Sequence, residues 1–487
     1  MGRQVWPRRG ETRDGMRIPS GCAVAGVAST AGRPISGDTV VCMVCAMPER
    51  TNGLGAGYAA YGIYPDLADC YAFHLMYGDP RARATVEELL QARFQVEVAE
   101  PIPTRPRLLA GATVLWRYFL RVPERVARSW EESHAEPGSN GPPGEDDYVV
   151  RTVMDINTGV PGAFVFSSGR DMGVFKAVGH PEAVADFFML DQYRGYSWLG
   201  HSRFPTNTPG WWGGAHPFSL LEWSVVHNGE LSSYGTNRRY VESFGYRCTL
   251  LTDTEVIVYL VDLLVRRHGL ALEVACRILT PPFWKELDGP GDRAALLRAA
   301  RIVYAGALLN GPFTTILGHS RGLVGLTDRL MLRPLVAATR GDLSYLASEE
   351  AAIRAFVLDA LDLAGASYSA PDEELVIAKV RLTKPGGFFA GPRVVEEDLQ
   401  LVFTTEGVEK HPSAELVSPG SLRLGWFIEQ ARTRGFLTRG FYAEEPETRK
   451  LEREIRARLS SFGAPVSLRL RECSFIPFFL AVLRLTF

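Results

Sequence analysis

The distribution of apolar and polar residues predicts both strands and helices along the chain. Residues 22–29 are small and apolar, with the β-branched Val24 and Val27, which predicts a buried strand. The glycine-rich run 43–65 predicts a turn-rich loop leading into another strand. Further strands are predicted in five segments, 162–169, 172–179, 313–328, 343–348 and 375–382.

Helical periodicity is clearest in residues 253–268, where Asp253 is the predicted N-cap and Arg266, Arg267 and His268 close the last turn. Residues 79–95 also predict a helix, with Thr85 as its N-cap. Two more helices are predicted at 349–361 and 444–459. The acidic, Pro/Gly-rich stretch 130–147 predicts a surface loop or short linker. Because strands and helices mix without a βαβ repeat, the expected class is α+β.

Composition narrows the class of protein. The chain has 487 residues, enough for two or three domains, with 46% hydrophobic and 22% charged residues, as in soluble globular proteins. A formal net charge of −2 gives no reason to expect nucleic acid as a partner. Seven cysteines are too few for a disulfide framework, which favours a cytoplasmic location. Since no run of 18 apolar residues occurs, no membrane span is predicted.

The N-terminal segment 1–21 is basic and glycine-rich and lacks the apolar core of a secretory signal. We therefore expect a leader that is removed or disordered. Cys42 and Cys45 form a single CxxC pair with no second pair, so no metal site is predicted.

Three segments carry candidate chemistry when they are taken together. They are GCAVAG with Cys22, the loop GHSRFPTNTPGWWGGAHPF followed by VVHNGELSSYGTN, and LTDTEV. A thiol that attacks an amide needs a base, an oxyanion hole and a clamp for the charged end of the substrate. If Cys22 becomes the first residue, its α-amine, with an ordinary pKa of about 8, can serve as the base.

The other segments hold groups suited to the remaining tasks. The Asn228 side-chain amide and the Gly229 N–H can stabilise an oxyanion, and glycine permits the close backbone approach. Arg203 can bind a substrate carboxylate through two hydrogen bonds. Asp253 can accept hydrogen bonds from an α-ammonium group. An alternative is an N-terminal-nucleophile amidohydrolase that acts on some other amide. Arg203 and Asp253 argue against it, because together they suit a free α-amino acid.

The set resembles the class II glutamine amidotransferases in residue type and in order along the chain. The family's HxRxxT, HNG and TDTE segments appear as His201–Thr206, as His227–Gly229 and as Thr252–Glu255. The SRFPTNT form is similar to the glutamate-synthase branch, and two further runs look like its stand-alone amidotransferase subunits, NGLGAGYAAYGIYP, preceded by Arg50, and PGWWGGAHPF. This chain departs from the family in having Ala23 after the cysteine, where the family usually has glycine.

The resemblance implies specific roles. Cys22 would be the nucleophile and, through its freed amine, the base, with Asn228 and Gly229 as the oxyanion hole. Glutamine would be bound by Arg203, Thr206 and Asp253, with Asn207 nearby and Arg50 close to the active-site strand. The implied fold is the four-layer αββα sandwich of N-terminal-nucleophile hydrolases.

The resemblance also implies a domain plan and a function. Residues 22–370 would form the amidotransferase domain and 371–487 a C-terminal extension of unknown role. The chain would release ammonia from glutamine for a partner subunit of glutamate-synthase type. No cofactor is expected in this chain, and FMN and iron–sulfur clusters are expected in the partner. The alternative is a non-catalytic regulatory or scaffold subunit of the same fold, in which Cys22 stays blocked by the leader.

Overall fold

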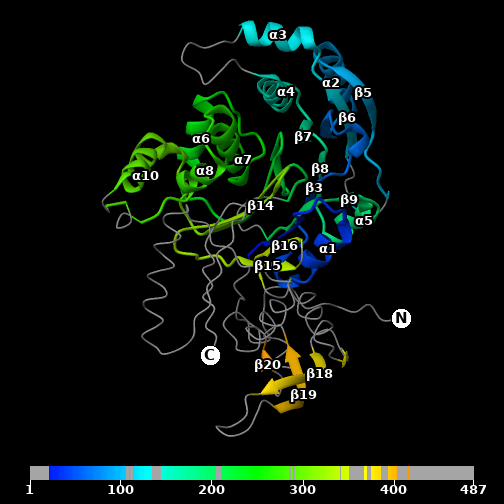
Figure 1. Cartoon of the computed structure of the whole chain (residues 1–487). Helices are drawn as coiled ribbons and strands as arrows, with labels where there is room; N and C mark the ends of the chain where they lie inside the picture. The colour runs from blue at the N-terminus through cyan, green and yellow to red at the C-terminus, as the bar shows by residue number, and fades with distance from the viewer. Residues whose placement is uncertain are drawn as a thin grey trace.

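The computed structural model describes most of the chain between Gly21 and Ser348. The described residues are 21–105, 109, 113–133, 144–204, 210–283, 287–288, 291–340, 342–349, 352, 367–369, 375–384, 393–402 and 415–416. Two sheets lie at its centre and helices cover their outer faces (Figure 1).

The first sheet is six-stranded, and the predicted strand after Cys22 lies inside it. Its order is β15 (Val336–Arg340), β16 (Leu343–Ala347), β1 (Ala23–Ser29), β10 (Ser197–Ser202), β3 (Ala56–Tyr61) and β8 (Met172–Ala177). All of its pairs are antiparallel. Every residue of β1 is buried, which explains its small, continuously apolar sequence.

The second sheet is four-stranded and packs face to face on the first. Its order is β11 (Phe218–Leu220), β12 (Trp223–Gly229), β13 (Phe313–His319) and β14 (Gly322–Thr327). Strands β1 and β10 contact β12 and β13 across the interface. The sheets approach closely at Gly26, where an added Cβ would lie 2.9 Å from Leu323 Cδ1. A glycine in β1 therefore permits this packing distance.

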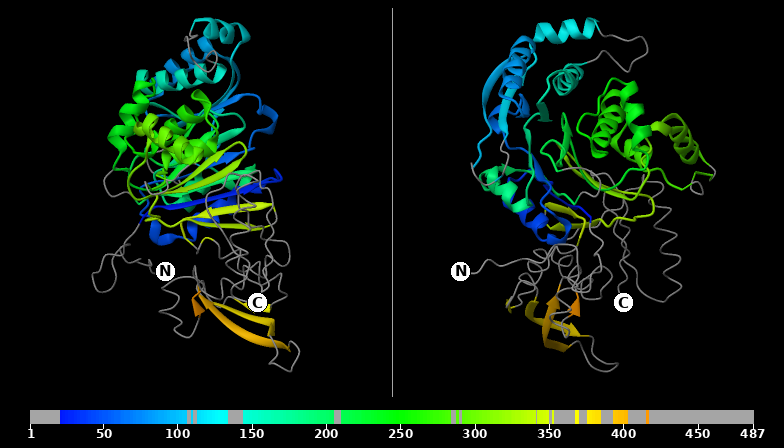
Figure 2. Two further views of the ribbon diagram at one scale, coloured as in Figure 1. Left: turned by 60° about the vertical axis from the view of Figure 1, so that its left-hand side comes forward. Right: turned by 180° about the vertical axis from the view of Figure 1, so that it is seen from behind.

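Helices complete the layers on both sides. On the first sheet lie α1 (Gly37–Cys45) and α5 (Pro181–Phe187), which contact β1, β10, β3 and β8. On the second sheet lies α7 (Thr254–Asp262), continued by a π-helical turn at Leu263–Arg267 and flanked by α6 (Tyr234–Ser243), α8 (Leu272–Leu279) and α10 (Asp292–Val303). Figure 2 shows these two groups of helices on opposite sides of the strands. The predicted αββα order is confirmed.

A third sheet, which the sequence did not predict as a separate unit, extends one side of the sandwich. Its order is β5 (Gln95–Pro101), β6 (Val114–Arg121), β4 (Tyr71–Tyr77) and β7 (Ala163–Ser167). Strand β7 contacts both β8 and β11, so this sheet borders both central sheets. Helices α2 (Pro80–Arg93) and α4 (Glu145–Gly159) pack on it, and α3 (Glu124–Ser133) contacts α4.

Several predicted boundaries are wrong in detail. The N-cap of α2 is Asp79, whose side chain accepts from the Arg81 N–H, and Thr85 lies inside the helix. Residues 43–45 end helix α1 instead of beginning a loop. In the predicted linker 130–147, both described ends are helical, in α3 and α4. Charged residues at helix ends resemble a solvated loop in composition, which explains the error.

Further along the chain the description is partial. The strand predicted at 375–382 is confirmed within β18 (Leu375–Lys384), which pairs with β17 (Ser367–Ser369) and β19 (Arg393–Val402), followed by β20 (Glu415–Leu416). The helix predicted at 444–459 and most of that at 349–361 lie outside the described residues.

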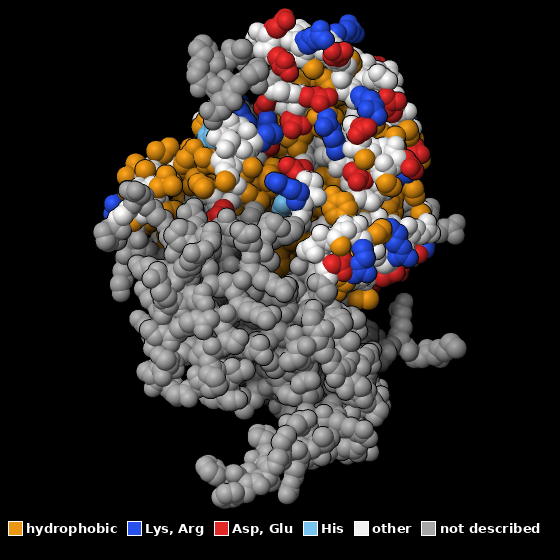
Figure 3. Space-filling view, in the orientation of Figure 1, with side chains coloured by type: hydrophobic (Ala, Val, Ile, Leu, Met, Phe, Trp, Pro, Cys, Tyr) orange, Lys and Arg blue, Asp and Glu red, His pale blue; other side chains and the backbone are white. Residues whose placement is uncertain are grey.

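In Figure 3 hydrophobic side chains gather over α10, where Leu296, Ile302 and Val303 are exposed.

Candidate active site

The predicted site residues come together where four elements begin or end. Cys22 directly precedes β1, and Arg203 directly follows β10. These strands are antiparallel neighbours with Ala23 opposite Ser202, so Cys22 and Arg203 lie side by side. Asn228 and Gly229 end β12 on the facing sheet, and Asp253 directly precedes α7. Thr206 and Asn207 lie outside the described residues.

The Cys22 thiol is half-buried and accepts a hydrogen bond from the Phe204 N–H, with 3.3 Å between N and Sγ. Burial raises the pKa of the thiol, while the Phe204 N–H and the nearby Arg203 oppose that rise. The thiol is therefore protonated near neutral pH. A base must take its proton before it can attack a carbonyl carbon.

The backbone nitrogen of Cys22 lies on the Asn228 side chain. It donates to Asn228 Oδ1 at 3.2 Å. In the unprocessed chain this nitrogen is part of a peptide bond, whose delocalised lone pair cannot accept a proton. Because Oδ1 accepts this hydrogen bond, the Nδ2 of Asn228 stays available as a donor to another group. Within the described residues that buried Nδ2 has no acceptor.

Gly229 fills a position that no other residue fits without strain. Its φ of 155° lies in the region that favours glycine, and an added Cβ would come 2.1 Å from the Pro312 carbonyl oxygen. The end of β12 can therefore approach the 312–313 backbone closely. Asn228 and Gly229 together form a candidate oxyanion hole, as predicted from the sequence.

Arg203 and Asp253 bring opposite charges to the same space. Arg203 is buried, its N–H donates to the Gly55 carbonyl at 2.8 Å, and burial lowers the pKa of its guanidinium. Burial alone would raise the pKa of Asp253, but His227 and the Leu231 N–H hold it below its ordinary value. The pair thus presents a cation and an anion, the charges that complement the carboxylate and ammonium of a free amino acid.

Asp253 does not cap α7 with its side chain, contrary to the sequence prediction. Its Oδ2 accepts from the Leu231 N–H at 2.9 Å, and its Oδ1 lies 3.6 Å from His227 Nδ1. The carboxylate is therefore held by the segment that follows β12. This arrangement links the Asp253 position to the oxyanion-hole strand.

A buried histidine cluster behind the site was only partly foreseen. His201 and His216 stack with ring centroids 4.0 Å apart. The Thr254 hydroxyl lies 2.7 Å from His216 Nε2 and 3.0 Å from His227 Nδ1. Burial lowers the pKa of His201 to about 3, so its ring is neutral and its Nε2 donates to the His227 carbonyl. His201 therefore has a structural role, and the sequence signal of the cluster is the set of HSR, HNG and TDTE segments.

Arg50 lies in the 3-10 turn Pro48–Arg50 and forms an ion pair with Glu349, just after β16. An added Cβ on Gly21 would lie 3.2 Å from Arg50 Nη1. The arginine is therefore next to the residue that precedes Cys22. Its predicted position near the active-site strand agrees with this geometry.

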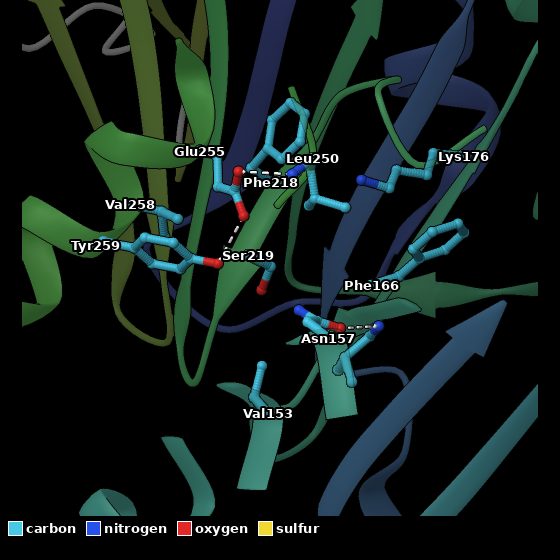
Figure 4. Close-up of a pocket in the computed structure, with 11 residues that line it drawn as sticks. Val153, Asn157, Phe166, Lys176, Phe218, Ser219, Leu250, Glu255, Val258 and Tyr259 are labelled. Atoms are coloured by element: carbon cyan, nitrogen blue, oxygen red, sulfur yellow. Dashed lines mark hydrogen bonds between the residues drawn. The ribbon is translucent and has the colours of Figure 1, made fainter. Parts of the chain in front are cut away.

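A small cavity beside the site contains a lysine that the sequence gave no reason to select. The ammonium of the fully buried Lys176 of β8 lies over the rings of Phe166 and Phe218 (Figure 4). It donates a hydrogen bond to the Gly213 carbonyl at 3.0 Å. Burial lowers the pKa of Lys176 to about 7. Across the cavity, Glu255 accepts from the Leu250 N–H and the Tyr259 hydroxyl. The cavity thus lies between β7, β8, β11, α4 and α7.

The described part of the chain holds no group of three or more His, Cys, Asp or Glu side chains that could bind a metal ion. Cys42 and Cys45 lie in α1. Within the same residues, no helix has the length and hydropathy needed to cross a bilayer.

Comparison with known proteins agrees with this geometry. The profile described as "Glutamine amidotransferases class-II" matches residues 147–354. An uncharacterized protein of Archaeoglobus fulgidus is 48% identical over 343 residues, covering 69% of this chain and 88% of its own length. A Methanothermobacter thermautotrophicus protein, described only provisionally as a glutamine amidotransferase, is 29% identical over 42% of this chain and 58% of its own length.

Two more distant matches are similar over less of their length. A glutamine--fructose-6-phosphate aminotransferase of Sulfurisphaera tokodaii is 34% identical over 20% of this chain and 17% of its own. The solved structure of the allosteric regulatory enzyme of purine biosynthesis is 14% identical, with a TM-score of 0.36, over 77% of this chain and 48% of its own. The fold is established by the order and packing of the two central sheets.

Proposed function

Since the chain belongs to the class II glutamine amidotransferases, we propose that it hydrolyses glutamine to glutamate and ammonia with Cys22 as the nucleophile. The observation that supports this most directly is the convergence on Cys22. Its nitrogen bonds Asn228, its thiol bonds the residue after Arg203, and the charge of Asp253 acts on its thiol. These groups supply a nucleophile, an oxyanion donor and a clamp for an amino acid.

The proposed reaction requires removal of residues 1–21, which converts the Cys22 peptide nitrogen to an amine. The amine takes the thiol proton, and Sγ attacks the side-chain amide carbon of glutamine. Asn228 Nδ2 and the Gly229 N–H donate to the resulting oxyanion. The amine then returns the proton to the leaving nitrogen, so that ammonia departs and a thioester remains. Water, deprotonated by the same amine, hydrolyses the thioester to glutamate and restores the thiol.

The ammonia acceptor is proposed to lie on another polypeptide. The SRFPTNT segment around Arg203 is similar to the glutamate-synthase branch, and we propose a partner subunit of that type, carrying FMN and iron–sulfur clusters. The relatives named as aminotransferases contain much more chain than the part this protein matches. Use of the ammonia is therefore expected outside the matched segment.

Intact-mass measurement and a reactive glutamine analogue test the proposal together. We expect the native protein to have a mass beginning at Cys22 and to release glutamate from glutamine. The analogue 6-diazo-5-oxo-L-norleucine is expected to label Cys22 and no other of the seven cysteines. The Cys22→Ala protein should fold normally and lose activity and labelling.

Two results would contradict the proposal. Full glutaminase activity of a processed Cys22→Ala protein would exclude Cys22 as the nucleophile. An uncleaved leader in the native protein, with no glutamine hydrolysis, would instead support the scaffold subunit. A Cys276→Ala variant is the matched control, since Cys276 is buried in α8, and it should keep both activity and labelling.

A further inference from the structure

Two guanidinium groups flank the residue that precedes Cys22. A Cβ built on Gly21 would lie 3.2 Å from Nη1 of Arg333 and 3.2 Å from Nη1 of Arg50, and 2.9 Å from Asn228 Oδ1. Since the Gly21 Cα is joined to the Cys22 nitrogen through one carbonyl carbon, Arg333 Nη1 lies within about 7 Å of that nitrogen. The same nitrogen becomes the α-amine when the leader is removed.

The two arginines differ in how their charge is balanced. Arg50 forms an ion pair with Glu349, which offsets much of its field. Among the described residues, no carboxylate forms an ion pair or hydrogen bond with Arg333. The Arg333 charge also reaches the Cys22 thiol, whose pKa it lowers. Arg333 is thus the less compensated cation on this side of Cys22.

The backbone of Arg333 is held next to the oxyanion-hole strand. The Thr314 hydroxyl donates to the Arg333 carbonyl at 2.8 Å, and Thr314 pairs with Asn228 between β13 and β12. The backbone of Arg333 is therefore held by β13, the neighbour of the strand that carries Asn228.

We propose that Arg333 is a positioning residue that keeps the freed α-amine of Cys22 uncharged, so that the amine can act as the base. This inference rests on the proposed function. A nearby cation disfavours protonation of an amine, because two like charges repel in the half-buried site. Arg333 thereby favours the neutral amine at a pH where an isolated α-amine is largely protonated.

Other charged groups lie around Cys22 or its neighbour Arg50 and act in both directions. Arg203 adds a further positive charge, while Asp253 and Glu349 are negative. Asp253 is itself held by His227 and the Leu231 N–H, and Glu349 by Arg50. Removing Arg333 leaves these groups in place. The amine and the thiol of Cys22 then both become harder to deprotonate, so their coupling does not change the expected sign.

The test is the pH profile of kcat/KM for glutamine in the processed full chain, confirmed by mass to begin at Cys22. For Arg333→Met we expect the acidic limb to move to higher pH by about one unit, with activity recovering at high pH. Arg333→Lys keeps the charge and should leave the limb near its wild-type position. The pH dependence of inactivation by 6-diazo-5-oxo-L-norleucine should shift in parallel.

The matched control is Arg329→Met, because Arg329 lies in the same loop and its guanidinium bonds the Asn310 side chain instead. It should leave the profile unchanged. An Arg333→Met limb that does not move would overturn the inference, as would an equal loss at every pH with a lowered Tm. If wild-type protein beginning at Cys22 does not hydrolyse glutamine at any pH, the proposed function fails instead, so the two failures are distinguishable.

Discussion

Asn228 and Arg203 are expected to act at different stages of the reaction. Asn228 should act only in the transition state, and Arg203 also on the bound substrate. The Asn228 Nδ2 is buried and without an acceptor in the described residues, so it can bond a charge that develops only during attack. We predict that Asn228→Ala lowers kcat by about a hundredfold or more with little change in KM. Steady-state kinetics with glutamine measure both constants.

For Arg203→Ala we predict the opposite division. A carboxylate clamp acts on bound substrate as well as on the transition state, so KM should rise by at least about thirtyfold. Arg321→Ala, which removes an exposed arginine at the turn between β13 and β14, is the control and should change neither constant. A large fall in kcat at constant KM for Arg203→Ala would contradict the assigned role.

At the same scale, the sequence predicted the residues whose chemistry is local and recognisable. Cys22, Arg203, Asn228, Gly229 and Asp253 were predicted as one site, and the structure brings them together. Lys176 and the Arg333 guanidinium were not predicted. The environment of each side chain is formed by residues distant in the chain, such as Gly213 for Lys176. No local sequence pattern indicates such a contact.

The role of backbone geometry can be tested at Gly229, the last residue of β12. In Gly229→Ala the new Cβ would collide with the Pro312 carbonyl, and φ would be unfavourable for alanine. We predict a loss of about 2 kcal/mol or more in the free energy of unfolding, measured by urea denaturation, together with loss of glutaminase activity. The control is Gly159→Ala. Gly159 is the last residue of α4 and has open space around it, so this substitution should be neutral or slightly stabilising. Equal stability of the two variants would refute the prediction.

Strand β8 carries a buried lysine that should make stability depend on pH. The pKa of Lys176 falls from 10.5 to about 7 on folding, mainly because burial disfavours its charge, with Glu255 opposing. Between these values the unfolded chain binds a proton that the folded chain does not, so stability falls as pH falls from 10.5 towards 7. We predict that the Tm of Lys176→Met, relative to wild type, increases as pH is lowered from 10 to 7.

The control for this measurement is Arg151→Met, which removes an exposed cation paired with Asp155 in α4. Its Tm difference from wild type should be nearly constant over the same range. A constant difference for Lys176→Met as well would mean that the lysine is charged in the folded protein throughout.

Elements with strong periodicity or continuous apolar character were predicted correctly, such as β1 and the helix that includes α7. Helices α1, α3, α4, α5, α6, α8 and α10 were not predicted. The predicted loop included the end of α1, and the polar first turn of α4, Glu145 to Asp147, looks like a continuation of the preceding linker. The third sheet was missed because the pairing of strands β4 to β7 is decided only in three dimensions.

At the scale of the molecule, the proposed partner is open to direct test. We predict that the chain, isolated from native lysate in mild salt, brings down a subunit that contains FMN and iron–sulfur clusters, visible by absorption spectroscopy. Glutamine turnover should be faster in the recovered complex than in the isolated chain. Recovery of the isolated chain alone would count against an obligate partner. The division at residue 370 stays a prediction.

The central place of β1 has a consequence for the lifetime of the processed protein. Chain ends usually fray and are the first sites of trimming. Here β1 is bonded to β10 on one side and β16 on the other, and the Val24 N–H donates to Ser348 Oγ at 3.1 Å. A terminus at Cys22 would therefore be inaccessible to aminopeptidases, and its amides would exchange with solvent only when the sheet opens. Its turnover in the cell would follow global unfolding, and the identity of the first residue would matter little.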